Sequence, residues 1–135
     1  ISGFNLSNSD LTGSDLSQSE ISEVDFSNCN LSSVNFSHST ISDSSFVNAT
    51  MEGTVLSNVC ILNSDFSEVD FNGVNLSGAD FSGADLSLSK NLIQAVCDTE
   101  TVWPDDELLP EDFDLNDVMT YEDMEDEGDY MPEEF

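Results

Sequence analysis

The chain has 135 residues and an extreme charge imbalance, with 29 acidic residues against a single lysine and a formal net charge of −28. Because nothing in such a chain can neutralise phosphates, direct binding to nucleic acid is excluded. The three cysteines form no CxxC pair, so no disulfide framework is expected. No stretch is long and apolar enough to predict a transmembrane segment.

A strict five-residue pattern runs from Ile1 to Leu86. A large apolar residue stands at every fifth position, and a small or compact residue precedes it by two positions in nearly every unit. A period of five matches neither the helical period of 3.6 nor the strand period of 2, so it predicts a repeat architecture. The large apolar positions are Ile1, Leu6, Leu11, Leu16, Ile21, Phe26, Leu31, Phe36, Ile41, Phe46, Met51, Leu56, Ile61, Phe66, Phe71, Leu76, Phe81 and Leu86.

The other positions of the unit are also restricted. Asp or Asn usually precedes the large apolar residue, and Ser or Thr often follows it, as in the segment VNLSGADFSGADLS at 74–87. In this pattern the chain closely resembles the pentapeptide repeat family, whose motif is written A(D/N)LXX. The resemblance implies an all-β fold: a right-handed quadrilateral β-helix in which four units form one square coil and about five coils stack along an axis.

The residues themselves are consistent with such a solenoid. If the small and the large apolar positions both turn inward, the interior is filled and leaves no cavity for a ligand. Stacking at a period of twenty aligns columns such as Phe26, Phe46 and Phe66, which stabilise neighbouring strands.

The five-residue register slips after Leu86. We interpret Leu88–Lys90 as a bulge, followed by a last imperfect coil through Leu92 and Cys97. Trp103 and Pro104 are expected to cap the solenoid, which gives a repeat domain at 1–103 and an acidic tail at 104–135. Because Ile1 opens directly in register without an initiator Met, we expect that the chain was processed or trimmed.

The tail is a polyanion. Residues 98–135 carry 17 acids and no base, whereas residues 1–97 carry 12 acids and Lys90. Such a block is mostly non-regular, although Leu115, Val118 and Met119 have the spacing of a short helix over 111–120.

Apolar residues that alternate with acids suit a segment that binds a groove on a protein partner with a basic surface. The alternative is a solvated tail that aids solubility. The tail residues predicted to bind the partner are Leu108, Leu109, Phe113, Leu115, Val118, Met119, Tyr121, Tyr130 and Phe135.

No combination of residues points to catalysis. His38 is the only histidine and is expected to point outward; Cys29 and Cys97 fall at core positions and Cys60 outside. A filled solenoid offers no concave site in which paired carboxylates could act as acid and base, so the chain is predicted not to be an enzyme and to need no cofactor. Weak association of Ca²⁺ or Mg²⁺ with the many carboxylates is expected, without a defined metal site.

A neutral belt interrupts the polar surface near the middle of the repeats. Val47, Val55 and Leu62 replace polar residues within about one coil and are candidates for docking against another protein. Ordinary variation between repeats is the alternative.

The sequence therefore predicts a non-enzymatic interaction or scaffold subunit, in which a rigid solenoid docks in a larger assembly and the acidic tail binds a basic partner. The family resemblance adds an alternative, a DNA mimic that binds a DNA-handling enzyme such as DNA gyrase. Against it, the predicted carboxylate rows have gaps. The resemblance suggests the cytoplasm or the chloroplast thylakoid lumen, and the compartment, the oligomeric state and the partner's identity stay open.

Overall fold

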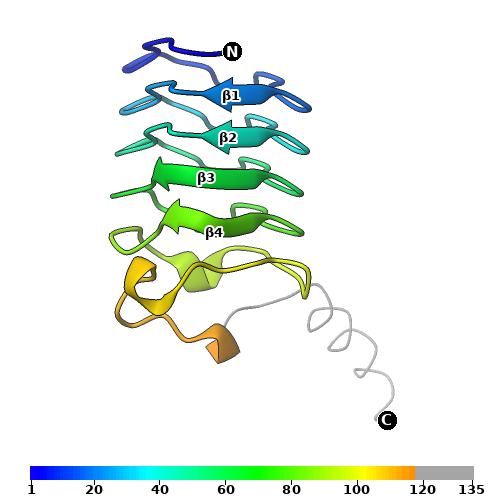
Figure 1. Ribbon diagram of the computed structural model, residues 1–135, viewed down its shortest axis with the longest axis vertical. Coiled ribbons are helices and arrows are strands. Elements are labelled where there is room, and N and C mark those ends of the chain that lie inside the picture. Colours follow the sequence, from blue (N-terminus) through cyan, green and yellow to red (C-terminus); the bar gives the residue numbers. More distant parts are fainter. Residues whose placement is uncertain (118–135) are drawn as a thin grey trace.

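The computed structural model describes residues 1–117, which form a square solenoid of stacked coils with a short segment folded across its C-terminal end (Figure 1). Each five-residue unit forms one side of the square, so residues twenty apart lie directly above one another. The backbone bridges between Asn5 and Asp25 and between Asp25 and Ser45 show this register. The fold is the quadrilateral β-helix predicted from the repeat.

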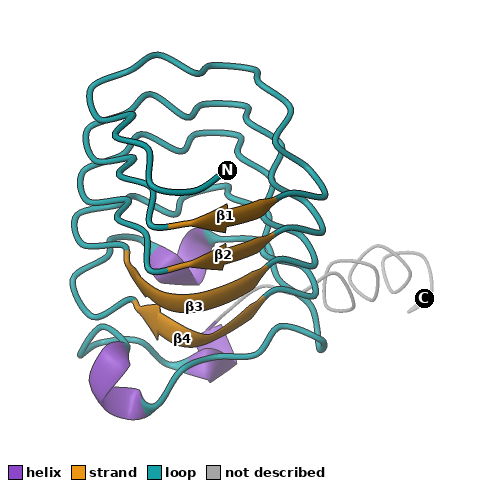
Figure 2. Cartoon of the chain, turned by 45° about the horizontal axis from the view of Figure 1, so that its top comes forward, coloured by secondary structure: helices purple, strands orange, loops and turns teal. Residues whose placement is uncertain are grey.

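One side of the square is regular enough to form a four-stranded parallel sheet in the order β1-β2-β3-β4 (Figure 2). Its strands are β1 (Glu20–Ser22), β2 (Thr40–Ser42), β3 (Cys60–Asp65) and β4 (Asp80–Asp85). We call the four sides the sheet face, the Phe face around Phe26, Phe46 and Phe66, the third face around Leu31, Met51 and Phe71, and the fourth face around Phe36, Leu56 and Leu76.

Two local features turn the chain at each corner. The Asp or Asn side chain accepts a hydrogen bond from the backbone N–H two residues ahead, as Asp25 does from Ser27 at 2.9 Å. The last residue of most units is left-handed, with φ of 58° at Asn28 and 74° at Gly53. Asn and Gly tolerate this conformation better than other residues, which explains their frequency at the corners.

The interior is packed with the predicted inward side chains. Phe46 stacks on Phe26 with ring centroids 4.9 Å apart and on Phe66 at 4.7 Å, and Phe36 meets Phe46 edge to face. The largest fully buried side chains are Phe26, Phe36, Phe46, Phe66, Phe71, Phe81, Ile21, Leu31, Ile41, Met51, Leu56 and Ile61. In the first coil, the large apolar residues after Ile1 are only partly buried.

The slip near residue 90 differs from the prediction. Ser89 is still buried at a small position and Lys90 still pairs with Asp70, so the expected bulge at Leu88–Lys90 is wrong. The extra residue is Asn91, which is left-handed with φ 57° and begins the 3-10 helix η1 (Leu92–Gln94). The spacing between bridged residues then grows to 21 for Asn75 and Val96.

The chain after Trp103 closes the C-terminal end of the solenoid. The N–H of Leu86 donates to the carbonyl of Leu108 at 2.8 Å, and Leu108 is the last residue of the 3-10 helix η2 (Asp106–Leu108). The Trp103 ring lies 6.5 Å from Phe81 and 5.1 Å from Phe113.

The short helix expected over 111–120 is not found in its described part. Residues 111–117 contain a turn and the single 3-10 turn η3 (Leu115–Asp117). Residues 118–120 lie outside the described residues. Three acids between Pro110 and Leu115 leave this stretch without an apolar face that packing could stabilise.

Candidate protein-interaction surfaces

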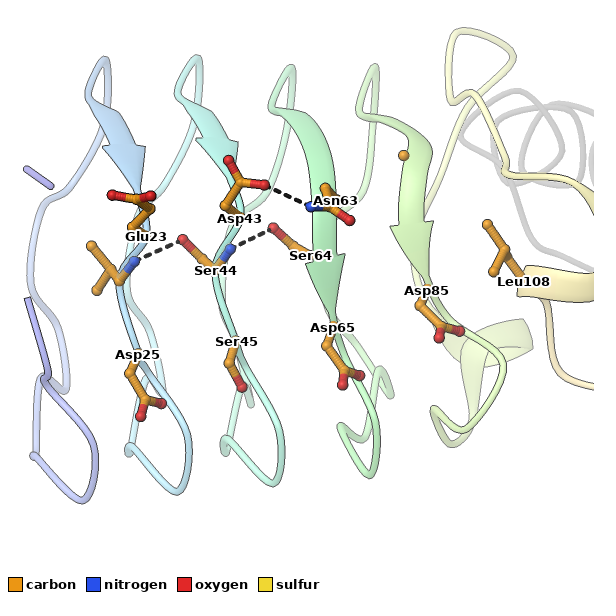
Figure 3. A pocket seen from close by; sticks show the side chains of 12 residues that line it. Glu23, Asp25, Asp43, Ser44, Ser45, Asn63, Ser64, Asp65, Asp85 and Leu108 are labelled. Carbon is orange, nitrogen blue, oxygen red and sulfur yellow. Dashed lines mark hydrogen bonds between the residues drawn. The ribbon is translucent and has the colours of Figure 1, made fainter. Parts of the chain in front are cut away.

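An open groove of about 750 Å³ runs along the corner between the sheet face and the Phe face (Figure 3). We call it the acidic corner groove. Two columns of side chains form its walls, each with one residue from each of four successive coils, and a column of small residues forms its floor. The residues that line it are Glu23, Val24, Asp25, Asp43, Ser44, Ser45, Asn63, Ser64, Asp65, Gly83, Asp85 and Leu108.

The repeat holds the floor of the groove rigid. The hydroxyl of Ser44 accepts from the N–H of Val24, and the hydroxyl of Ser64 accepts from the N–H of Ser44, both at 3.2 Å. Each serine thus links one coil to the next. At Gly83 a Cβ would lie 3.0 Å from the carbonyl oxygen of Ile61, so only glycine fits beside β3 without displacing backbone.

The carboxylates in one wall have fixed positions. The side chains of Asp25, Asp65 and Asp85 each accept a backbone hydrogen bond from the serine two residues ahead, at 2.9, 2.9 and 3.0 Å. The side-chain hydroxyl and then the backbone N–H of Ser27 hold the pKa of Asp25 below its usual value. The turn hydrogen bonds therefore hold these three carboxylates close to one orientation.

The other wall is less regular. Asp43 accepts a hydrogen bond of 2.6 Å from the amide of Asn63 in the next coil, while Glu23 lies one coil before it. The groove therefore presents five carboxylates along four coils, and no cation lines it. Lys90, the only lysine or arginine of the chain, is paired with Glu68 at 3.0 Å elsewhere.

The structure distributes the predicted tail residues over three environments. Leu108 lines the C-terminal end of the groove, Leu109 and Phe113 pack against the solenoid core, and Leu115 is exposed in η3. Packing on the core therefore continues beyond residue 103. The other predicted tail residues lie outside the described residues; they are Val118, Met119, Tyr121, Tyr130 and Phe135.

The three residues predicted for the neutral belt point from different sides of the solenoid. Val47 follows Phe46 on the Phe face, Val55 bridges Asn35 and Asn75 on the fourth face, and Leu62 is exposed on β3 of the sheet face. They do not converge on one surface.

The three cysteines and His38, which are the remaining candidates for reactive side chains, do not form a cluster. Cys29 and Cys97 are buried and Cys60 is partly exposed, as predicted, and His38 is exposed. Burial is the main cause that raises the pKa of the Cys29 thiol. Within residues 1–117 no three metal-ligating side chains converge, and no helix is long and apolar enough to cross a membrane.

The acidic corner groove itself was not predicted. Its signal in the sequence is visible only when residues twenty apart are read as columns: 23, 43, 63 and 83 form one wall, and 25, 45, 65 and 85 form the other. Leu108 joins the groove because the chain folds back across the last coil, which no repeat position indicates.

Two family models match the sequence. The model described as a pentapeptide repeat region covers residues 19–94, and the model described as pentapeptide repeats (8 copies) covers residues 1–28. No curated protein matches the chain.

Solved structures with the same kind of repeat are similar to this one. A pentapeptide repeat protein from the thylakoid lumen of Arabidopsis thaliana is 26% identical with a TM-score of 0.56; the match covers 73% of this chain and 60% of that protein. A pentapeptide repeat protein from the cyanobacterium Cyanothece 51142 is 24% identical, with a TM-score of 0.48 and coverage of 76% and 63%. This chain therefore spans less than two thirds of the length of either protein.

A third structure, the plasmid-mediated fluoroquinolone resistance protein QnrB1, is 17% identical. The match covers 94% of this chain and 87% of that protein, with a TM-score of 0.30.

Proposed function

Because the chain belongs to the pentapeptide repeat family, we propose that it is a non-enzymatic protein-interaction module whose acidic corner groove receives a basic, extended segment of a partner protein. The observation that carries this proposal is the set of five carboxylates that line one groove without a cation. Fixed acids in a concave surface attract and orient a chain of lysines and arginines.

The groove also supports a preferred orientation of the partner. Among residues 1–117, Leu108 is the only large aliphatic side chain that lines the C-terminal end of the groove, whereas Glu23 and Asp25 line the opposite end. A segment with an apolar residue at one end and cations after it matches both features. In this proposal Leu108 anchors the partner, and the acids of the following segment extend the negative surface.

The DNA-mimic alternative receives less support from the arrangement of charges. The wall of Asp25, Ser45, Asp65 and Asp85 has three carboxylates over four coils, at roughly 4.8 Å per coil. Duplex DNA carries a charge about every 1.7 Å of its axis. A gyrase supercoiling assay with the intact chain tests this alternative, and inhibition of gyrase would favour it over the partner-segment proposal.

A labelled peptide of alternating Lys and Ala residues tests the groove directly. Asp65→Asn/Asp85→Asn removes two charges from the groove, and Asp10→Asn/Asp15→Asn removes two charges from the first coil, outside it. Asn keeps the oxygen that accepts the turn hydrogen bonds in both variants. We expect the groove variant to weaken peptide binding several-fold more than the control, measured by fluorescence anisotropy.

Equal weakening in both variants would show that only the overall charge attracts the peptide. Leu108→Ser provides a second comparison, with a peptide that ends in Leu and one that ends in Ala. The proposal expects the preference for the Leu peptide to disappear in this variant, and an unchanged preference would place the apolar contact elsewhere.

A further inference from the structure

The segment that closes the C-terminal end of the solenoid combines two opposing features. Its apolar residues Leu109 and Phe113 pack on the core, while all of its acids are exposed and no cation lies within it. We call residues 104–117 the acidic cap. Its acids are Asp105, Asp106, Glu107, Glu111, Asp112, Asp114 and Asp117.

Short-range contacts hold the acidic cap in place. Trp103 stacks on Phe81, and Phe113 packs against Trp103 with ring centroids 5.1 Å apart. The N–H of Leu86 donates to the carbonyl of Leu108 at 2.8 Å, in place of the next coil of the repeat. Apolar packing and this hydrogen bond depend little on salt.

Long-range repulsion opposes these contacts. Seven carboxylates lie within thirteen residues of the acidic cap, and Asp85 lines the same groove as the cap residue Leu108. Asp98 and Glu100 precede the cap in the last coil. The one nearby cation, Lys90, lines a cavity of about 320 Å³ together with Asp112, but it is already paired with Glu68.

We propose that the acidic cap is a salt-gated clasp, closed when its carboxylates are screened and released when they are not. The Debye length is about 8 Å at physiological ionic strength and roughly 30 Å at 0.01 M. The carboxylates of the cap therefore repel one another weakly at physiological ionic strength and strongly at low ionic strength.

Release of the clasp exposes a binding surface. When the cap is released, the N–H of Leu86 loses its acceptor at Leu108, and the Trp103 ring loses its contact with Phe113. An unpaired edge of this kind is a template to which an extended segment of another chain can add. A cationic partner that neutralises the cap has the opposite effect and favours closure. The clasp shares Leu108 with the proposed function of the groove, but the salt titrations that test it use no partner peptide.

Trp103 is the only tryptophan and therefore reports on the clasp directly. Its fluorescence emission is followed in the intact chain as NaCl is raised from about 0.01 M to 0.15 M, while far-UV circular dichroism monitors the solenoid. We expect the emission to shift from red to blue as the ring becomes covered, without a change in the circular dichroism. Constant emission would overturn the proposal.

Two matched triple variants separate the cap from the overall charge. Asp106→Asn/Glu107→Gln/Glu111→Gln removes three charges from the cap, and Glu20→Gln/Glu23→Gln/Glu52→Gln removes three from the coils. None of these six carboxylates accepts a hydrogen bond that fixes a turn. The cap variant is expected to close at several-fold lower salt than the wild type, and the coil variant at nearly the same salt. An identical shift in both variants would overturn the local mechanism.

Two further measurements test the contacts and the nature of the salt effect. Phe113→Ala removes an apolar contact to Trp103 and should keep the emission red at every salt concentration, and a shift to blue at high salt, as in the wild type, would contradict the role of this contact. MgCl₂ at equal ionic strength should act like NaCl, because screening is not specific. Closure at a far lower ionic strength of MgCl₂ would indicate a bound cation and overturn screening as the cause.

Discussion

The Asp or Asn of each repeat unit has a structural role that does not depend on charge. Its side-chain oxygen accepts the N–H that would otherwise be unpaired at the corner, as in Asp25 with Ser27 and Asn35 with Ser37, both at 2.9 Å. Either residue type supplies the oxygen, which explains why both occur at this position. The surface charge can therefore vary from coil to coil without any change in the turn.

Substitution of Asp25 separates the turn from the charge. Asp25→Ala removes the acceptor for both bonds from Ser27 and is expected to destabilise the fold by roughly 1 kcal/mol, a value reduced because the side chain is partly exposed to solvent. Asp25→Asn keeps an acceptor and should change stability much less. Urea unfolding of the three proteins measures the difference. An equal loss in both variants would mean that the charge, rather than the hydrogen bond, stabilises this corner.

The effect of Asp25 should also depend on pH. Its pKa is lowered in the folded state, so its contribution to stability is complete above the unfolded pKa of about 3.9 and is lost as the pH falls through the folded pKa. We therefore expect the stability difference between the wild type and Asp25→Ala to be constant near neutral pH and to shrink below about pH 4. A difference that grows on acidification would contradict this assignment.

Corner residues with positive φ give a prediction of the opposite sign. Gln18 is left-handed with φ 55°, and Gln18→Gly should stabilise the fold by about 0.5 kcal/mol, since relief of steric strain exceeds the added chain entropy. Gly13→Ala is the matched control, because φ is 75° there and no atom lies within 4 Å of the added Cβ. It should be destabilised by strain alone. Thermal unfolding of both variants checks the signs, and a destabilised Gln18→Gly would contradict the prediction.

At the scale of elements, the columns of identical positions hold the coils together. Phe46 is fully buried, stacks between Phe26 and Phe66, and also meets Phe36. Phe66 continues the contacts to Phe81, which leads to Trp103 in the last coil. The aromatic contacts thus run from the second coil to the acidic cap.

Phe46→Ala tests this column. The change leaves a cavity among three other rings, and we expect a loss of about 3–5 kcal/mol. Leu6→Ala lies at the equivalent position of the first coil, where the side chain is only partly buried, and should cost much less. Chemical denaturation measures both variants. Similar losses would mean that the end coil is as tightly packed as the middle.

The elements could be predicted from the sequence wherever the repeat is regular. The inward positions and the stacked columns follow from the period alone, because each unit has the same geometry. The error near residue 90 has a local cause: Ser89 continues the small column, so the register is kept until Asn91. Nothing in the pattern distinguishes an insertion after residue 90 from a bulge before it.

At the scale of the whole molecule, charge repulsion opposes the folded state. The chain carries a net charge of −28, and within residues 1–117 a single salt bridge joins Lys90 to Glu68. Added salt therefore weakens mainly the repulsion between carboxylates, because there are few attractive ion pairs for it to weaken.

We expect the thermal midpoint to rise as NaCl increases, with most of the gain below about 0.15 M. A stabilisation of roughly 1 kcal/mol corresponds to about 3–5 °C for a chain of this size. Differential scanning calorimetry measures the midpoint, and sucrose at matched osmolality controls for general solute effects. A midpoint that falls with salt would show that attractive ion pairs dominate.

The candidate site was only partly predictable at this scale. Acidic character could be inferred from composition, and Leu108, which lines the groove, was among the apolar tail residues proposed as partner contacts. The groove could not, because it combines positions on both sides of a small residue from four separate coils with a residue that follows the repeat. Its charge is also set by the positions that lack an acid, which are Ser45 in one column and Asn63 and Gly83 in the other.

Because equivalent residues twenty apart stack on one another, the length of the solenoid can change only in steps of one twenty-residue coil. Removal of residues 41–60 would place Ile61 above Ile21 and Phe66 above Phe26, so each column would close again on a residue of its own kind. The rod would shorten by one strand spacing, roughly 4.8 Å, and each face would keep its orientation. Length can therefore change in whole steps during evolution, and the corner groove lengthens or shortens with it while the ends stay the same.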